Sequence, residues 1–173
     1  MNKNVILTGM MGVGKSTIGR MVAKKLKYSF IDIDKLIEAK EGCSINLIFK
    51  NKGENYFRRM ENNITLQELK RNNSVISLGG GAFLNKSIRR NVKKFSVSFW
   101  LDVSVVLLIK RLERTKNRPL LYKKNLKDVV KKIYLERKKT YNEAEFKIIC
   151  NYLKSSEIVN KVLKLYEKTR NKV

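Results

Sequence analysis

The segment from Gly9 to Ser16 constrains the fold of this chain more than any other part of the sequence. It reads Gly-Met-Met-Gly-Val-Gly-Lys-Ser, with four residues between two glycines and then a lysine and a hydroxyl residue, which is the spacing of a phosphate-binding loop. An apolar run at 4–8 precedes it and predicts a buried strand, and the apolar spacing within 15–27 predicts a helix after it. This strand–loop–helix order favours an α/β fold.

The chemistry of the loop requires these residue types. Glycines allow the backbone to curl so that several N–H groups point at phosphate oxygens, and the positive end of the following helix lies at the same place. Lys15 would reach the β- and γ-phosphates of a nucleoside triphosphate, and Ser16 would hold Mg²⁺. The loop therefore predicts nucleotide binding, but it does not identify the acceptor of a phosphoryl group.

Short apolar strands alternate with helices along the rest of the chain, which is typical of a parallel sheet covered on both faces. The predicted strands are 4–8, 28–32, 75–78, 97–101 and 146–150. The predicted helices are 15–27, 35–40, 45–49, 55–71, 105–114, 125–140 and 157–168. The 173 residues contain no linker and no internal repeat, so we predict a single domain.

Composition excludes several classes of site. The chain lacks histidine and has two cysteines, Cys43 and Cys150, so a zinc site and a histidine acid or base are excluded. Two lone cysteines favour a reducing compartment over a disulfide scaffold. The N-terminus lacks the layout of a signal peptide, and no apolar stretch is long enough to span a bilayer. We expect a monomeric cytoplasmic protein with no membrane partner.

The charge is strongly positive. Lysine and arginine number 39 against 15 acidic residues, a formal charge of +24, which would attract polyanions in a salt-sensitive way. The basic residues are spread along predicted helix faces rather than gathered in one run. We therefore favour a general compositional bias over a specific nucleic-acid site.

Two acids follow the second predicted strand. Asp32 and Asp34 are separated by Ile33, so in an extended chain both carboxylates point the same way, at the edge of the sheet where ligands bind in open α/β folds. One acid could support Mg²⁺ and its water shell, and the other could take a proton from an acceptor hydroxyl. Equally, Asp34 could simply be the N-cap of the helix that follows.

Two further segments have the composition of a ligand site. The first is 53–61, which contains Arg58, and the second is the glycine run 79–81 at the end of a predicted strand. Three glycines suit a close approach of backbone to a ligand, although a plain tight turn has the same composition. Arg58 by itself would usually be a solvated helix residue.

Taken together, these motifs resemble the shikimate kinase family from about residue 4 to about residue 141. The phosphate loop occurs in many families, so the ordered set of the other blocks carries the resemblance. The matching blocks are Gly9 to Arg20, Asp32 to Asp34, Gly53 to Glu61, Leu78 to Ala82, Arg118 to Leu121 and Glu136 to Tyr141.

The resemblance implies a role for each motif residue. Asp34 is similar to the residue that binds the shikimate hydroxyl and acts as general base. Arg118 is similar to an arginine of the lid. Together with Lys15, these two residues form the expected catalytic set. Mg²⁺ is expected at Ser16 and Asp32. The expected ATP-binding residues are Gly12, Val13, Gly14, Lys15, Ser16, Thr17, Arg114 and Arg118. The expected shikimate-binding residues are Asp34, Arg58, Gly79, Gly80, Gly81 and Arg137. Paired guanidinium groups suit a carboxylate because they bind it bidentately.

The resemblance also implies the architecture and the reaction. The fold would be a P-loop kinase fold, with a central five-stranded parallel sheet in the order 2-3-1-4-5 flanked by helices. A substrate-binding segment at about 32–59 and a lid at about 115–125 would belong to the same domain. The reaction would transfer the γ-phosphoryl group of ATP to the 3-hydroxyl of shikimate. Family members commonly carry proline two residues after the position of Arg137, where this chain has Lys139.

Three alternatives remain open on the sequence alone. A related small-metabolite kinase, such as a gluconate kinase, would also need arginines for a carboxylate. The tetrapeptide at 51–54 superficially resembles a guanine-reading motif, but its fourth residue is wrong and it lies too early in the chain. A basic nucleic-acid-binding protein with a phosphate loop would fit the charge, although no aromatic-basic recognition motif is present.

Overall fold

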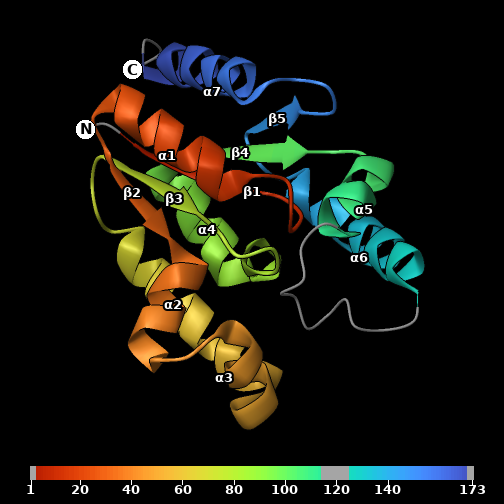
Figure 1. Cartoon of the computed structure of the whole chain (residues 1–173). Helices are drawn as coiled ribbons and strands as arrows, with labels where there is room; N and C mark the ends of the chain where they lie inside the picture. Colours follow the sequence, from red (N-terminus) through yellow and green to blue (C-terminus); the bar gives the residue numbers. More distant parts are fainter. Residues whose placement is uncertain (1–2, 114–124, 171–173) are drawn as a thin grey trace.

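The computed structural model describes residues 3–113 and 125–170, and these residues build one parallel sheet (Figure 1). Its strand order within this part of the chain is β2-β3-β1-β4-β5, so the predicted order is confirmed. The strands are β1 Asn4–Thr8, β2 Ser29–Asp32, β3 Ser74–Ser77, β4 Ser96–Asp102 and β5 Phe146–Ile149.

The central strands are buried along their whole length. Every residue of β1, β3 and β4 is buried, as expected of parallel strands that helices cover on both faces. Strand β1 pairs with β3 on one side and with β4 on the other, and Val5 is in register with Val75 and Val97 of these two strands. β1 therefore lies in the middle of the sheet, and the phosphate loop leaves from its carboxyl end.

Helices form a layer on each face of the sheet. Figure 1 shows α7 running beside α1. Because the connections between the parallel strands are right-handed, α1 lies on the face of the sheet opposite α3, α4 and α6. The helices are α1 Lys15–Leu26, α2 Ile33–Glu41, α3 Ile45–Glu68, α4 Lys86–Phe95, α5 Val105–Glu113, α6 Leu126–Tyr141 and α7 Ser155–Arg170, with a short 3₁₀ turn η1 at Ala82–Leu84. Among the described helices, none has the length and apolarity to cross a bilayer.

Helix α4 was not predicted. Its buried residues are Ile88 and Val92, one turn apart, and basic side chains surround them, so the apolar stripe is too narrow to signal a helix by periodicity. The start is fixed by Asn85, whose Oδ1 accepts hydrogen bonds from the backbone N–H groups of Ser87 and Ile88. Such capping is worth about 1 kcal/mol.

The segments predicted as two helices at 45–49 and 55–71 form one continuous element, α3, that kinks at Gly53. The glycine has φ 77° and ψ 169°, which is not helical, and such a conformation favours a residue without Cβ. The predicted interruption between the two segments is therefore confirmed, although nothing in the sequence indicated that the helix resumes directly after the kink. The helix also ends earlier than predicted, at Glu68.

The second strand ends at Asp32, and α2 begins at Ile33, so the two acids do not lie on one extended segment. Asp32 is the N-cap residue, with its side chain accepting from the backbone N–H of Lys35. Asp34 lies in the first helical turn. The predictions of an extended Asp32–Asp34 pair and of Asp34 as N-cap were therefore wrong. Because Asp34 is not used as the cap, its carboxylate can serve the site.

Candidate active site

The phosphate loop lies between the end of β1 and the start of α1. Gly12 and Gly14 have φ 79° and 96°, and this left-handed backbone curls the loop as a phosphate cradle requires. Lys15 Nζ lies across the loop and donates hydrogen bonds to the carbonyl oxygens of Gly9 at 2.9 Å and Met10 at 3.0 Å. The first turn of α1 contains no acidic residue, so the positive end of the helix is available to an anion.

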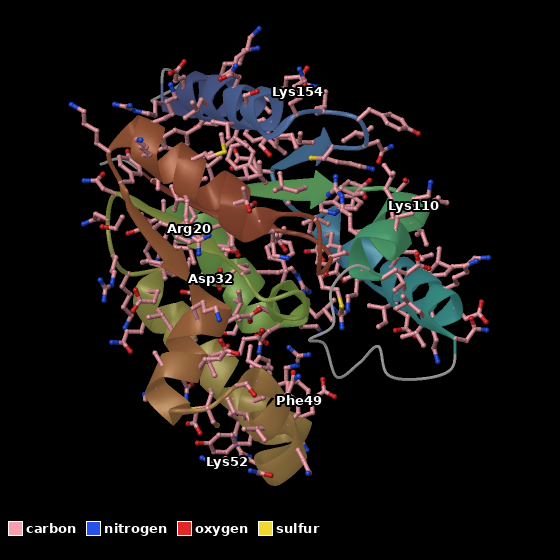
Figure 2. All side chains as sticks on the ribbon, in the orientation of Figure 1. Arg20, Asp32, Phe49, Lys52, Lys110 and Lys154 are labelled. Atoms are coloured by element: carbon pink, nitrogen blue, oxygen red, sulfur yellow. The ribbon has the colours of Figure 1, made fainter. Side chains whose placement is uncertain are left out.

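Asp32 joins the loop to α2. Its Oδ2 accepts a hydrogen bond from Ser16 Oγ at 2.5 Å, and its Oδ1 accepts one from Lys35 N at 3.4 Å. Figure 2 labels Asp32 where β2 meets α2, and Phe49 farther along in α3. A hydroxyl and a carboxylate in contact are hard oxygen ligands of the kind that Mg²⁺ prefers. The pair therefore fits a magnesium ion that takes its other ligands from water and nucleotide phosphates.

Two carboxylates meet at Gly79, where β3 ends. A Cβ added to Gly79 would clash with Glu61 Oε1 and would come within 2.7 Å of Asp34 Oδ1. Only glycine fits at this position, because any side chain would displace one of the two acids. Asp34 therefore lies against the backbone that follows β3, and it lines the same cavity as the phosphate loop.

Glu61 holds Arg58. Arg58 Nη1 contacts Glu61 Oε2 at 2.7 Å, and Arg58 Nη2 contacts Glu54 Oε1 at 3.0 Å. Glu61 is 2% exposed, and its Oε1 has no hydrogen-bond partner among the described residues. Burial raises the pKa of Glu61 above its ordinary value, while the Arg58 guanidinium opposes that rise. The guanidinium lies against Gly81, where a Cβ would come within 2.5 Å of Arg58 Nη1.

Glu61→Gln tests that environment through the pH dependence of stability. Because the pKa of Glu61 is raised in the folded state, the folded protein binds more protons than the unfolded chain above about pH 4.5, and stability falls as pH rises through the folded pKa. Glutamine removes this dependence. The difference between the melting temperature of the variant and that of the unmodified protein should therefore increase as pH rises from 4.5 to neutrality. A constant difference at all pH values would contradict the raised pKa.

Arg137 reaches the site from α6. Its Nη1 donates to the carbonyl oxygen of Gly80 at 2.8 Å. The helix runs unbroken through Lys139 to Tyr141, so lysine at this position does not interrupt the element that carries the arginine.

One cavity of about 810 Å³ connects these groups. It is lined on the loop side by Gly12, Gly14, Lys15, Ser16 and Thr17, with Asp32 adjoining, and on the other side by Asp34, Arg58, Glu61, Gly80, Gly81 and Arg137. Phosphate cradle, carboxylate and two guanidinium groups thus face a single space.

Most residues predicted for the site line this one cavity. The exceptions are two residues that lie outside the lining and two that the structure does not describe, and one lining residue, Glu61, had no predicted role. Val13 is buried and does not line the cavity, and Gly79 lies behind Asp34 and Glu61 rather than in the lining. Arg114 and Arg118 lie outside the described residues. Glu61 was predicted only as the end of a matching block, although an acid three residues after Arg58 on a helix indicates an ion pair.

Known proteins resemble this chain over nearly its full length. The family model described as shikimate kinase matches residues 11–167. A shikimate kinase from Sulfurihydrogenibium sp. (strain YO3AOP1) is 41% identical over 161 residues, which are 93% of this chain and 96% of that protein.

Solved structures give the same result. Shikimate kinase from Acinetobacter baumannii in complex with shikimate has a TM-score of 0.92 and 33% identity, covering 96% of this chain and 94% of that one. A gluconokinase from Sinorhizobium meliloti 1021 has a TM-score of 0.59 at 17% identity over 99% and 97% of the two chains, a likeness of fold alone. The extent of the family match and the identity to its members establish that this chain belongs to the shikimate kinase family.

Proposed function

We propose that this chain transfers the γ-phosphoryl group of ATP to the 3-hydroxyl of shikimate. The observation that carries the proposal is the single cavity in which the phosphate loop faces Asp34, Arg58 and Arg137. A kinase must hold two substrates in line within one water-poor space. The proposal is supported by family membership and by the described geometry.

On the nucleotide side, the proposed ATP-binding groups are the backbone N–H groups of the loop and Lys15. The carbonyl oxygens of Gly9 and Met10 hold Lys15 Nζ, so the ammonium group is already directed across the loop before a phosphate arrives. A small reorientation would exchange those carbonyls for phosphate oxygens. The ammonium group would then stabilise charge that develops on the transferring phosphoryl group.

On the acceptor side, Arg58 and Arg137 would bind the shikimate carboxylate, and the glycine run at 79–81 would face the ring hydroxyls. Guanidinium groups hold a carboxylate in a fixed orientation, because each presents parallel N–H donors. That orientation would direct one ring hydroxyl toward Asp34 and the phosphate loop.

The chemical step is an in-line displacement. A bond forms between the 3-hydroxyl oxygen of shikimate and the γ-phosphorus, and the bond from that phosphorus to the β,γ-bridging oxygen breaks, releasing ADP. Asp34 accepts the hydroxyl proton as the new bond forms. The products are shikimate 3-phosphate, ADP and that proton, which Asp34 later passes to solvent.

Magnesium would bind at Ser16 and Asp32, the hydroxyl–carboxylate pair in contact at 2.5 Å. When bound, the ion neutralises phosphate charge. Ser16 Oγ would be the direct protein ligand, and Asp32 would orient that hydroxyl and the ion's water shell.

Asp32→Asn is expected to raise the Mg²⁺ concentration needed for half-maximal activity about 10- to 100-fold, because orienting partners of metal ligands contribute that much to affinity. Titration of activity against Mg²⁺ at fixed ATP measures this effect. Asparagine keeps an oxygen that can accept from Lys35 N, so the helix cap should survive and the melting temperature should change little. An unchanged Mg²⁺ requirement would rule out the proposed role of Asp32.

Further parts of the proposal concern the lid and the architecture. Arg118 would close over the phosphates and Arg114 would contact the adenine, within a lid at about 115–125. The substrate-binding segment would be 32–59, in a single domain, since one buried core includes residues from β1 through α7. We propose that a monomer is active, because one chain supplies all the cavity-lining residues named above.

An acceptor panel tests the proposal. ADP release would be followed with Mg-ATP and shikimate, with gluconate, and with no acceptor, and then repeated with GTP. We expect turnover with shikimate and ATP that exceeds the acceptor-free rate by several orders of magnitude, which is the scale of enzyme catalysis. Turnover with gluconate and not shikimate, or a preference for GTP, would refute it. Salt-sensitive binding to DNA together with no turnover of shikimate would favour the nucleic-acid alternative.

A further inference from the structure

The carbonyl oxygen of Gly80 accepts hydrogen bonds from two side chains of α6. Arg137 Nη1 donates to it at 2.8 Å, and the Tyr141 hydroxyl donates to it as well. These residues are four positions apart, so they lie on the same face of the helix, one turn from each other. Arg137 lines the cavity, whereas Tyr141 is fully buried behind it.

Tyr141 also contacts the beginning of the phosphate loop. Its ring packs on Trp100 with 5.9 Å between centroids, and its hydroxyl lies 3.9 Å from Met10 Sδ. Trp100 in turn borders Gly9, where a Cβ would lie 3.3 Å from Trp100 Cδ1. The tyrosine therefore lies between the glycine run and the loop, with its orientation fixed by packing.

The hydroxyl is a permanent donor. Burial raises the pKa of Tyr141 above its ordinary value, so the phenol is protonated throughout the neutral range. The Gly80 carbonyl consequently keeps this partner at every pH at which the enzyme would work.

A fixed Gly80 carbonyl also fixes the next N–H group. The carbonyl of Gly80 and the N–H of Gly81 belong to one planar peptide unit and point in opposite directions. Glycine backbone has a wide choice of conformations, so a peptide between two glycines needs external contacts to hold one orientation. Gly80 and Gly81 both line the cavity, and Arg58 lies against Gly81.

We infer that Tyr141 is a positioning residue for the acceptor site: its hydroxyl, with Arg137, holds the Gly80–Gly81 peptide in the orientation that binds the acceptor. The inference rests on the proposed function, because the acceptor in question is shikimate. Tyr141 does not line the cavity, and its hydroxyl reaches the acceptor groups through the Gly80 carbonyl that it shares with Arg137.

Tyr141→Phe tests the inference, since it removes the hydroxyl and keeps the ring that packs on Trp100. Loss of one neutral hydrogen bond should raise the KM for shikimate about 2- to 12-fold. The KM for ATP should stay within about twofold, because the hydroxyl reaches the phosphate loop only through the weakly accepting sulfur of Met10. Steady-state kinetics with each substrate varied in turn measures this split.

Tyr166→Phe is the matched control. Tyr166 in α7 is also fully buried, and its hydroxyl donates to a backbone carbonyl, that of Lys3, at 2.6 Å. It does not line the cavity. This variant should lose comparable stability with no change in the KM for shikimate. An equal rise in the KM for shikimate in both variants would mean that loss of stability alone causes the effect, and it would overturn the inference.

Two further outcomes are decisive. If Tyr141→Phe is too unstable for kinetics, shikimate binding is measured instead by the rise in melting temperature that shikimate produces. A rise in Tyr141→Phe as large as that in the unmodified protein overturns the inference. An active unmodified enzyme with an unchanged KM in Tyr141→Phe also overturns it, leaving the proposed function intact. If the unmodified protein does not turn over shikimate, the proposed function fails and the inference fails with it.

Discussion

Asp34→Asn is expected to lower kcat about 10²- to 10⁴-fold, the range that a positioned general base contributes. The amide keeps the shape of the carboxylate but cannot accept the hydroxyl proton. The KM for ATP should change much less than kcat, because Asp34 lines the cavity beside the acceptor groups and is not part of the phosphate loop. Folding should be preserved, since Asp34 lies close to the buried Glu61 and removing one of two neighbouring negative charges relieves repulsion. Single-turnover phosphoryl transfer at saturating shikimate measures the effect directly.

The matched control is Glu41→Gln, the same chemical change at the other end of α2. Glu41 is bound to Lys52 and Tyr56 and does not line the cavity. Its side chain is only 7% exposed, so the variant should lose some stability. It should nevertheless leave kcat within about twofold, because Glu41 does not line the cavity. Equal losses in both variants, or full activity in Asp34→Asn, would eliminate Asp34 as the base.

Arg58→Ala is expected to affect binding and stability together. Hydrogen bonds to a charged group contribute about 1.5–3 kcal/mol, so the KM for shikimate should rise about 10- to 100-fold. The substitution also leaves the buried Glu61 without its cation, which should lower the free energy of unfolding by about 1–3 kcal/mol. Initial-rate kinetics and urea denaturation measure the two effects separately.

Arg59→Ala and Arg58→Lys complete that experiment. Arg59 is exposed one position along α3, so its removal should change neither quantity. Lysine at 58 restores the charge but not the planar fork, and its KM should lie between those of the unmodified protein and Arg58→Ala. A KM for shikimate that is unchanged in Arg58→Ala would indicate a different acceptor or a different binding mode.

The parts of the fold that depend on local order were predictable. The phosphate loop from Gly9 to Ser16 is contiguous, and the strand before it and helix after it follow from simple apolar patterns. The position of β3 between β1 and β2 is a long-range property, which no local pattern determines, and it was predicted only through the family resemblance. Helix α4 was missed because Ile88 and Val92 give almost no periodic signal among basic residues.

The site was predictable as a set of residues but not as a set of contacts. Arg58 and Arg137 were expected to serve one ligand. The three-residue spacing indicates that Glu61 pairs with Arg58, but it does not indicate that this pair is buried at the site. An N-cap was one of two equally weighted interpretations of Asp34, whereas the structure has Asp32 as the N-cap. Both acids precede the same apolar helix, and only the backbone at Ile33 distinguishes them. Arg114 and Arg118 remain predictions.

The most direct test of the central claim is identification of the product by ³¹P and ¹H NMR after incubation with Mg-ATP and shikimate. The cavity joins the phosphate loop to the acceptor groups, so we predict one phosphate monoester, coupled to the proton on carbon 3 and formed in equal amount with ADP. Release of inorganic phosphate alone, or a monoester at another hydroxyl, would contradict the assignment of Asp34, Arg58 and Arg137 to a shikimate site.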